Sequence, residues 1–220
     1  MLILSDVLSP DDVVRIRSGL ETIPFVDGKA TAGAVARKVK SNQQADGGAP
    51  GMEAIRQFVR EALERHALFV PYVRPARWSK LMVSRYGPGD AYGLHTDDAL
   101  MRAESGERLR TDLSFTLFLS EPETYEGGAL LLDGLEGERE LRLPAGSAVV
   151  YRTGELHRVT PVTRGERLAC VGWLQSLIRR ADERDILFDL VRVRAHLPEG
   201  EARLLLDKAS GNLMRLWSEP

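Results

Sequence analysis

Two histidines and one acidic residue have the types and spacing of a metal site. His95 and Asp97 are two positions apart, and His157 follows sixty residues after Asp97. In an extended segment, side chains at i and i+2 point the same way, so His95 and Asp97 can face one ion while Thr96 and Asp98 point elsewhere. Two imidazoles and one carboxylate, with other positions left open, suit a non-haem Fe(II) centre. We therefore predict an iron site at His95, Asp97 and His157.

Arg167 has the features of a binding group for an acidic cosubstrate. It alternates with Ala169, Val171 and Trp173 in an apolar run, so we expect it to be buried. A buried guanidinium needs a carboxylate partner, which a dicarboxylic 2-oxo acid would supply. Tyr86 can add a hydroxyl to the same carboxylate. An isolated arginine would more often be a surface charge, so the prediction depends on the whole set of residues.

Several longer segments extend this pattern over nearly the whole chain. They are Tyr86–Asp97, Arg110–Ser120, Tyr125–Gly128, Leu143–Gly146, Leu156–Gly165 and Trp173–Ser176. In these segments the chain resembles Fe(II)/2-oxoglutarate dioxygenases of the prolyl 4-hydroxylase type, and more closely the bacterial PKHD-type hydroxylases. The resemblance implies iron ligands at His95, Asp97 and His157, and binding of the distal carboxylate of 2-oxoglutarate by Arg167. It also implies L-ascorbate (vitamin C) as the reductant that keeps the iron in the Fe(II) state.

The same comparison gives candidates for the pocket wall and for substrate contacts. Ser114, Thr116 and Phe118 alternate on one strand face, which by the resemblance looks toward the cosubstrate. Trp173 shares the face of Arg167. By the resemblance, the segment around Lys40 and Asn42 lies near the mouth of the barrel, so these two residues and Tyr92 are substrate candidates.

The remaining pattern predicts a mainly β fold with flanking helices. Helices are indicated from Ser9 and over Met52–Leu68, and Ala34–Lys40 suggests a strand that leads into a flexible polar loop. The expected strands are Leu2–Val7, Lys80–Tyr86, Asp112–Leu119, Ala129–Asp133, Glu138–Leu143, Ser147–Tyr151 and Arg167–Leu174. Such runs, separated by Gly- and Pro-rich turns, favour a jelly roll, here the double-stranded β-helix. We expect this domain over residues 1–177, with a catalytic core at about 78–177.

Residues 178–220 form a separate helical subdomain in this interpretation. Two apolar stripes, at Ile186–Val191 and Ala202–Leu216, have helical spacing, with an interruption near Gly211. An apolar stripe must be covered, either by the barrel or as a lid or homodimer surface, and we favour packing against the barrel.

Composition limits the remaining possibilities. The 220 residues suit one enzyme-sized domain, and 30 basic against 32 acidic residues, for a net charge of −2, argue against nucleic acid as a partner. The single cysteine, Cys170, lies in an apolar strand and is expected to be a small buried hydrophobe. Neither a secretion signal nor a membrane span is apparent, so we expect a cytoplasmic protein.

We therefore predict a 2-oxoglutarate-dependent dioxygenase that hydroxylates a small molecule or peptide and releases succinate and carbon dioxide. Two alternatives stay open. One is a cupin-like metal dioxygenase without an oxo-acid cosubstrate, against which Arg167 and Tyr86 argue. The other is a non-catalytic sensor of iron or 2-oxoglutarate. Fold and cofactor site together do not define the substrate.

Overall fold

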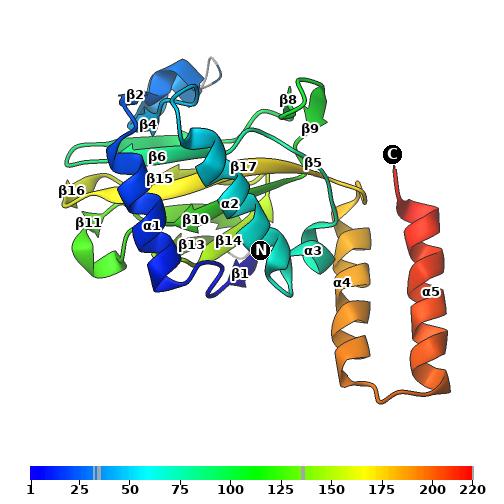
Figure 1. Ribbon diagram of the computed structural model, residues 1–220. Coiled ribbons are helices and arrows are strands. Elements are labelled where there is room, and N and C mark those ends of the chain that lie inside the picture. The colour runs from blue at the N-terminus through cyan, green and yellow to red at the C-terminus, as the bar shows by residue number, and fades with distance from the viewer. Residues whose placement is uncertain (32, 34–35, 135–136, 220) are drawn as a thin grey trace.

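Two antiparallel β-sheets form the body of the protein (Figure 1). The computed structural model describes residues 1–31, 33, 36–134 and 137–219. In order across the larger sheet, the strands are β1 (Leu2–Leu4), β14 (Ala148–Arg152), β10 (Leu113–Phe118), β17 (Arg167–Ser176), β6 (Met82–Tyr86), β4 (Gln43–Ala45) and β2 (Phe25–Asp27), with β5 (Pro75–Trp78) beside β17. The smaller sheet contains β13 (Gly137–Leu141), β12 (Leu130–Gly134), β15 (Leu156–Val159), β7 (Ala91–His95) and β3 (Lys40–Ser41).

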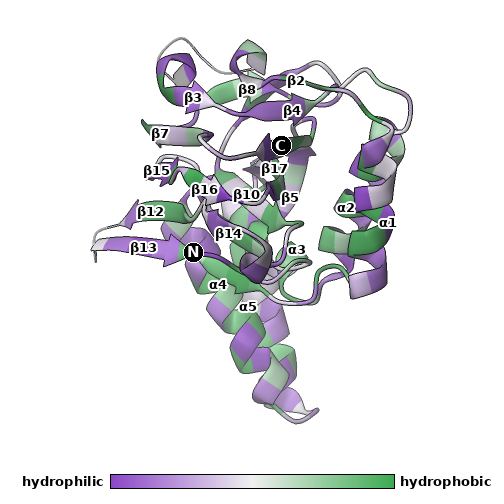
Figure 2. Ribbon diagram, turned by 90° about the vertical axis from the view of Figure 1, so that its left-hand side faces the viewer, coloured by the Kyte–Doolittle hydropathy of each residue, from purple (hydrophilic) through white to green (hydrophobic). Residues whose placement is uncertain are grey.

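Two further strand pairs complete the sheet structure, namely β11 (Glu126–Gly127) with β16 (Val162–Arg164) and β8 (Leu100–Arg102) with β9 (Arg108–Arg110). A short 3-10 helix, η3 (Pro122–Thr124), precedes β11. At the outer edge of the smaller sheet, β13 is hydrophilic over most of its length (Figure 2). Charged edge strands resist pairing with another chain. The arrangement confirms the predicted mainly β fold with flanking helices.

The longest strand, β17, serves two different interiors. Leu168, Cys170 and Leu174 point into the main apolar core, where α1 (Pro10–Glu21), α2 (Met52–Arg65) and α3 (Phe69–Val73) cover the larger sheet. Arg167 points the other way, into the space between the two sheets. Because side chains alternate along a strand, β17 lines both the core and a pocket. Burial raises the pKa of the Cys170 thiol to about 12, which agrees with its expected structural place.

The helices begin and end for local reasons. Ser9 caps α1 in a capping box with Asp12, and Pro10 occupies the first turn, as predicted from the sequence. The second predicted helix ends three residues earlier than expected, at Arg65. His66 has an extended backbone and stops the helix, and its Nε2 lies 3.1 Å from the carbonyl oxygen of Ser5. This contact attaches the end of α2 to the segment after β1.

The segment between α1 and α2 corrects one prediction. It contains two 3-10 helices, η1 (Gly28–Thr31) and η2 (Ala36–Val39), followed by β3 and β4. The expected strand at Ala34–Lys40 is therefore wrong over Ala36–Val39, while residues 34–35 lie outside the described residues. The polar run after it is not a loop, because β4 pairs with both β2 and β6. Buried Gln44 contributes to this order, since its amide donates to Ser84 and a buried polar group with partners is tolerated in a strand.

The carboxy-terminal helices form a hairpin that projects from the barrel (Figure 1). Helix α4 (Ala181–His196) packs on α3, where Phe188 meets Tyr72 edge to face at 5.2 Å between ring centroids. Helix α5 (Glu201–Trp217) lies on α4 and has no buried residue. It also runs through Gly211 without the expected interruption. Among the described residues, no helix combines the length and the apolar character needed to span a membrane.

This arrangement does not match the expected packing of α5 on the barrel. The described end of the chain returns to the barrel instead, where Glu219 accepts a 2.8 Å hydrogen bond from Arg110. Ser218 forms a β-bridge with Ile178. The hairpin is thus closed at its base, while Leu204, Leu205 and Leu216 of α5 remain exposed.

Candidate metal centre and cosubstrate pocket

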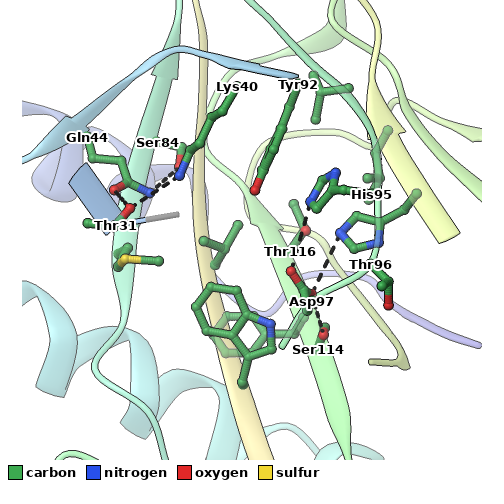
Figure 3. A pocket seen from close by; sticks show the side chains of 18 of the residues that line it. Thr31, Lys40, Gln44, Ser84, Tyr92, His95, Thr96, Asp97, Ser114 and Thr116 are labelled. Atoms are coloured by element: carbon green, nitrogen blue, oxygen red, sulfur yellow. Dashed lines mark hydrogen bonds and ion pairs between the residues drawn. The ribbon is translucent and has the colours of Figure 1, made fainter. Parts of the chain in front are cut away.

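The three predicted ligand side chains meet at one end of the smaller sheet. Figure 3 shows two of them, His95 and Asp97, pointing toward each other. His95 ends β7 and lies opposite His157 of the neighbouring strand β15 in the ladder. Asp97 lies two residues beyond the end of β7. Its carboxylate oxygens lie 3.9 Å from Nε2 of His95 and 3.6 Å from Nε2 of His157. All three ligand atoms lie within 4.8 Å of one another, close enough to share one ion.

Backbone carbonyl oxygens select the tautomer of both imidazoles in their neutral form. Nδ1 of His95 lies 2.8 Å from the carbonyl oxygen of Gly93, and Nδ1 of His157 lies 3.0 Å from that of Glu155. A carbonyl oxygen only accepts, so each neutral ring carries its proton on Nδ1 and leaves the Nε2 lone pair free. Burial, reinforced by His157, lowers the pKa of His95 to about 4. His95 is therefore neutral near pH 7, the form that binds a metal.

The donor set fits an iron ion. Nε2 of His95 is buried and has no hydrogen-bond partner within the described part of the chain. Such an atom is costly to leave unpaired, and a bound metal would satisfy it. Two imidazole nitrogens and one carboxylate on one side, with the other positions open, form the arrangement that non-haem Fe(II) oxygenases use. His95, Asp97 and His157 would hold this ion.

Neighbouring side chains hold the ligands in place. The Ser114 hydroxyl donates to Asp97 Oδ2 over 3.0 Å and lies 3.0 Å from the Thr153 hydroxyl. The imidazoles contact aromatic rings. The Tyr92 ring stacks on the His95 imidazole with 3.6 Å between ring centroids. The Tyr151 ring meets the His157 imidazole edge to face at 5.4 Å. Partners of this kind orient metal ligands and restrict their rotamers.

Arg167 is a buried cation without a carboxylate partner in the described structure. It is only 2% exposed, and its Nε has no hydrogen-bond partner there. The guanidinium lies over the rings of Tyr86 and Phe118, at 5.3 and 5.4 Å from their centroids. The adjacent acid, Glu166, is on the opposite face and lies 3.9 Å from Arg85. A carboxylate supplied from outside the chain would complete the environment of Arg167.

One cavity joins the metal ligands to Arg167. Of the residues singled out from the sequence, its walls include Tyr86, Ser114, Thr116, Trp173, Lys40 and Tyr92. Phe118 lies behind this wall in the apolar cluster around Tyr86, where it contacts Arg167. Asn42 is buried beside Gly28 and is not among the described lining residues. The cavity wall thus contains all of the predicted site residues except Phe118 and Asn42.

Other lining residues were not identified from the sequence, notably Thr31, Gln44, Ser84 and Tyr151. Alternation could have indicated Ser84, since it lies on the same strand face as Tyr86. Gln44 had no comparable signal, because its position depends on the pairing of β4 with β6.

Two adjacent glycines allow close approaches of the backbone beside Arg167. Gly127 has φ +72°, and a Cβ there would lie 2.0 Å from the carbonyl oxygen of Pro161. Gly128 has φ +62°, and a Cβ there would lie 3.1 Å from Cδ of Arg167. Only glycine fits both the left-handed backbone and the close approach.

Comparisons with known proteins agree with this geometry. A sequence model of the 2OG-Fe(II) oxygenase superfamily matches residues 81–175, which include every ligand and Arg167. A PKHD-type hydroxylase of Maricaulis maris is 51% identical over 98% of both chains. The chain belongs to the PKHD-type hydroxylases. A second relative with that name, from Hyphomonas neptunium, is 45% identical over the full length of both chains.

Solved structures place the PKHD-type hydroxylase in the wider fold family. A Pseudomonas putida prolyl-4-hydroxylase matches 80% of this chain and 91% of its own, with a TM-score of 0.53 and 22% identity. A Trichoplax adhaerens prolyl hydroxylase matches 84% of this chain and 86% of its own, with a TM-score of 0.58 and 15% identity. These neighbours confirm the double-stranded β-helix. The PKHD-type hydroxylase is an enzyme of the Fe(II)- and 2-oxoglutarate-dependent oxygenase family.

Proposed function

We propose that this hydroxylase couples hydroxylation of its substrate to oxidative decarboxylation of 2-oxoglutarate. One oxygen atom of O₂ would enter a substrate C–H bond to give C–OH, and the other would enter succinate as carbon dioxide leaves. The observation that carries the proposal is the cavity that joins the triad of His95, Asp97 and His157 to the buried Arg167, which has no carboxylate partner among the described residues. Fe(II), when bound, supplies the activation of oxygen.

The protein's own contribution is placement and exclusion of water. Arg167 binds the distal carboxylate of 2-oxoglutarate and thereby orients its 2-oxo end toward the triad. Burial raises the pKa of Tyr86, so its phenol stays a neutral hydrogen-bond donor beside Arg167. Leu130, Val159 and Phe115 form apolar parts of the wall. A general acid or base is not needed for this reaction.

Several associated properties belong to the same proposal. Ascorbate would act as the reductant, and the cytoplasm, which contains 2-oxoglutarate, would be the compartment. The exposed leucines of α5 would form a homodimer surface. The substrate would be a small molecule or a peptide. Structures of the same fold include a prolyl hydroxylase with a peptide fragment and HygX of Streptomyces hygroscopicus with nickel, 2-oxoglutarate and hygromycin B bound.

The test separates three candidate functions. Anaerobic addition of Fe(II) and then 2-oxoglutarate should give the visible charge-transfer band of the chelate. Its absence, with iron bound, would favour a metal dioxygenase without an oxo-acid cosubstrate. A screen of peptides, free amino acids and small iron chelators should then find a compound that stimulates succinate formation. A protein that forms the chelate but produces no succinate, either alone or with any added compound, would be a sensor.

A further inference from the structure

A second buried cation, Lys40, lies in the wall of the same cavity (Figure 3). It begins β3 and pairs with Tyr92 of β7, the strand that ends at His95. The residue is only 5% exposed, and its Nζ lies 5.2 Å from the centroid of the Tyr92 ring. Lys40 therefore adjoins the metal ligands through one aromatic ring.

The ammonium group of Lys40 has hydrogens to spare. Nζ carries three hydrogens and donates one to the Thr31 hydroxyl over 3.2 Å. Within the described residues, no carboxylate lies within 4.0 Å of Nζ, and Asp97 and Asp27 act on it only from farther away. A buried ammonium without a counter-ion is expensive, so a wall that retains one indicates a ligand that supplies the charge.

The hydrogen bonds next to Lys40 form a chain in which Lys40 is a donor and receives no acceptor of its own beyond Thr31 in the described structure. The Thr31 hydroxyl lies against two acceptors, the carbonyl oxygen of Gly28 and Oε1 of Gln44, so its lone pair is left for Lys40. The Gln44 amide in turn donates to the Ser84 hydroxyl over 3.4 Å. Each of the three side-chain oxygens in this group thus already accepts one hydrogen bond from within the wall. The group therefore offers the cavity N–H and O–H donors.

Other unpaired atoms in the cavity have the same character. Apart from the ligand atom of His95, the buried lining atoms without partners in the described structure are Nε of Arg167 and Nε1 of Trp173. Both are donors. A compound that fills this space must therefore bring acceptor atoms.

The buried charges leave a surplus after the cosubstrate is counted. A divalent ion, Arg167 and Lys40 together outweigh Asp97 and the two carboxylates of 2-oxoglutarate by one positive charge. An imidazole binds a metal in its neutral form, so His95 and His157 would add no charge. Asp98 also borders the cavity, but it is exposed and its charge is screened by solvent. A monoanion in the substrate position would neutralise the buried charges.

We propose that Lys40 receives a carboxylate of the primary substrate, which makes that substrate a carboxylic acid such as an amino acid or the acidic group of a peptide. This inference rests on the proposed function, because it assigns the space beside the 2-oxoglutarate site to the compound that is hydroxylated. Lys40 thereby becomes a specificity-determining residue, while Arg167 holds the cosubstrate.

The test uses acetate as the probe, with acetamide as its neutral analogue. The full chain is loaded anaerobically with Fe(II) and 2-oxoglutarate, and each probe is titrated by calorimetry at fixed ionic strength. Acetate should bind the parent and bind Lys40→Met at least tenfold more weakly, because a charge-assisted hydrogen bond is lost. Acetamide should bind neither. Lys38→Met, which removes an exposed charge nearby, should behave as the parent.

Three results would overturn the assignment: equal acetate affinity in the parent and Lys40→Met, no acetate binding to the parent, or equal binding of acetamide and acetate. Lys40→Gln replaces Lys40→Met if the latter does not fold. The chelate band is read before the titration and is independent of it. Its absence contradicts the proposed function, whereas a normal band with equal acetate affinities contradicts only the assignment of Lys40.

Discussion

At the scale of single residues, the proposed metal ligands and the proposed cosubstrate group, Arg167, are separate parts of one cavity. The triad uses atoms that the backbone and Ser114 hold in place. Arg167 lies apart from the triad, since it forms no hydrogen bond or ion pair with His95, Asp97 or His157 in the described structure. Substitutions in the two groups should therefore have different effects.

The first prediction concerns Asp97. Asp97→Ala removes the only carboxylate of the triad, so we expect loss of stoichiometric Fe(II) binding with the fold retained. Anaerobic iron titration and circular dichroism measure the two properties. Asp98→Ala is the matched control, because Asp98 is exposed and outside the triad. Iron binding by Asp97→Ala as tight as that of the parent would remove Asp97 from the metal site.

The second prediction concerns Arg167. Arg167→Ala should weaken 2-oxoglutarate binding by about 1.5 to 3 kcal/mol, roughly tenfold or more, with little change in iron affinity. Arg167→Lys should restore only part of the affinity, since lysine lacks the planar fork. Arg164→Ala is the control, because Arg164 is exposed and pairs with Glu126. Calorimetric titrations with equal 2-oxoglutarate affinity for parent and Arg167→Ala would contradict this assignment.

A third prediction follows from the cost of burying Lys40. Burial lowers the pKa of Lys40 to about 8 from 10.5, against the opposing effect of Asp97 and Asp27. The folded apoprotein thus loses this proton more readily than the unfolded chain. The penalty is fully present below pH 8 and disappears as the pH rises through 10.5.

Lys40→Met should therefore stabilise the apoprotein below pH 8, by on the order of 1 to 3 kcal/mol, and the gain should shrink toward pH 10.5. Urea unfolding at several pH values measures this difference. The exposed Lys38→Met variant should show no such pH-dependent gain. A constant difference from pH 7 to pH 10.5 would contradict an unpaired, buried Lys40.

At the scale of elements, the pairing of β11 with β16 brings the backbone of Gly127 against Pro161. Gly127→Ala must accommodate both a positive φ and a Cβ 2.0 Å from the Pro161 oxygen. We expect a loss of about 3 kcal/mol or more in the free energy of unfolding. Gly106→Ala is a matched control with φ +88° and open space, and should cost only about 1 kcal/mol. Equal losses in thermal or urea unfolding would show that the close contact at Gly127 relaxes.

The edge position of β3 has a functional consequence at this scale. A two-residue strand places Lys40 in the pocket and leaves Ser41 exposed, by the alternation of side chains. Its partner β7 carries both Tyr92 and His95. One strand pair therefore carries both the substrate candidate Lys40 and the proposed metal ligand His95.

At the scale of the whole molecule, the α4–α5 hairpin contributes no residue to the described lining of the site. Helix α4 has a structural function, because Leu187 is buried and Phe188 packs on Tyr72. Helix α5 has no buried residue and is joined to the barrel by the chain end at Ser218 and Glu219. The two helices should therefore differ in their importance for stability.

The fifth prediction is that a chain that ends after Leu197 folds and forms the Fe(II)·2-oxoglutarate band. We expect a small loss of stability, since a partly exposed pair such as Arg110 with Glu219 contributes about 0 to 1 kcal/mol. Light scattering should show a monomer if the parent is a dimer through the leucines of α5. A folded truncate without the band would contradict the division of the chain after residue 177.

The sequence by itself determined which residues could bind a metal together and that Arg167 would be buried. His95 and Asp97 occupy i and i+2 on one extended segment, so their common direction follows from local geometry. The burial of Arg167 could be predicted because Val171 and Trp173 share its strand face. The strands of the jelly roll and the capped start of α1 could also be predicted, because they depend on neighbouring residues. These features depend on residues close together in the chain, where side-chain period and capping chemistry act.

Only the tertiary structure decided which distant segments complete the pocket. Gln44 and Ser84 become neighbours because β4 pairs with β6, and Lys40 reaches the site because β3 pairs with β7. Polar residues at 41–44 resemble a loop in sequence, since polarity alone does not reveal partners 40 residues away. The exposure of α5 could not be predicted from the sequence either. An apolar stripe predicts that some surface will cover a helix, but it does not specify which surface, because that choice depends on long-range packing.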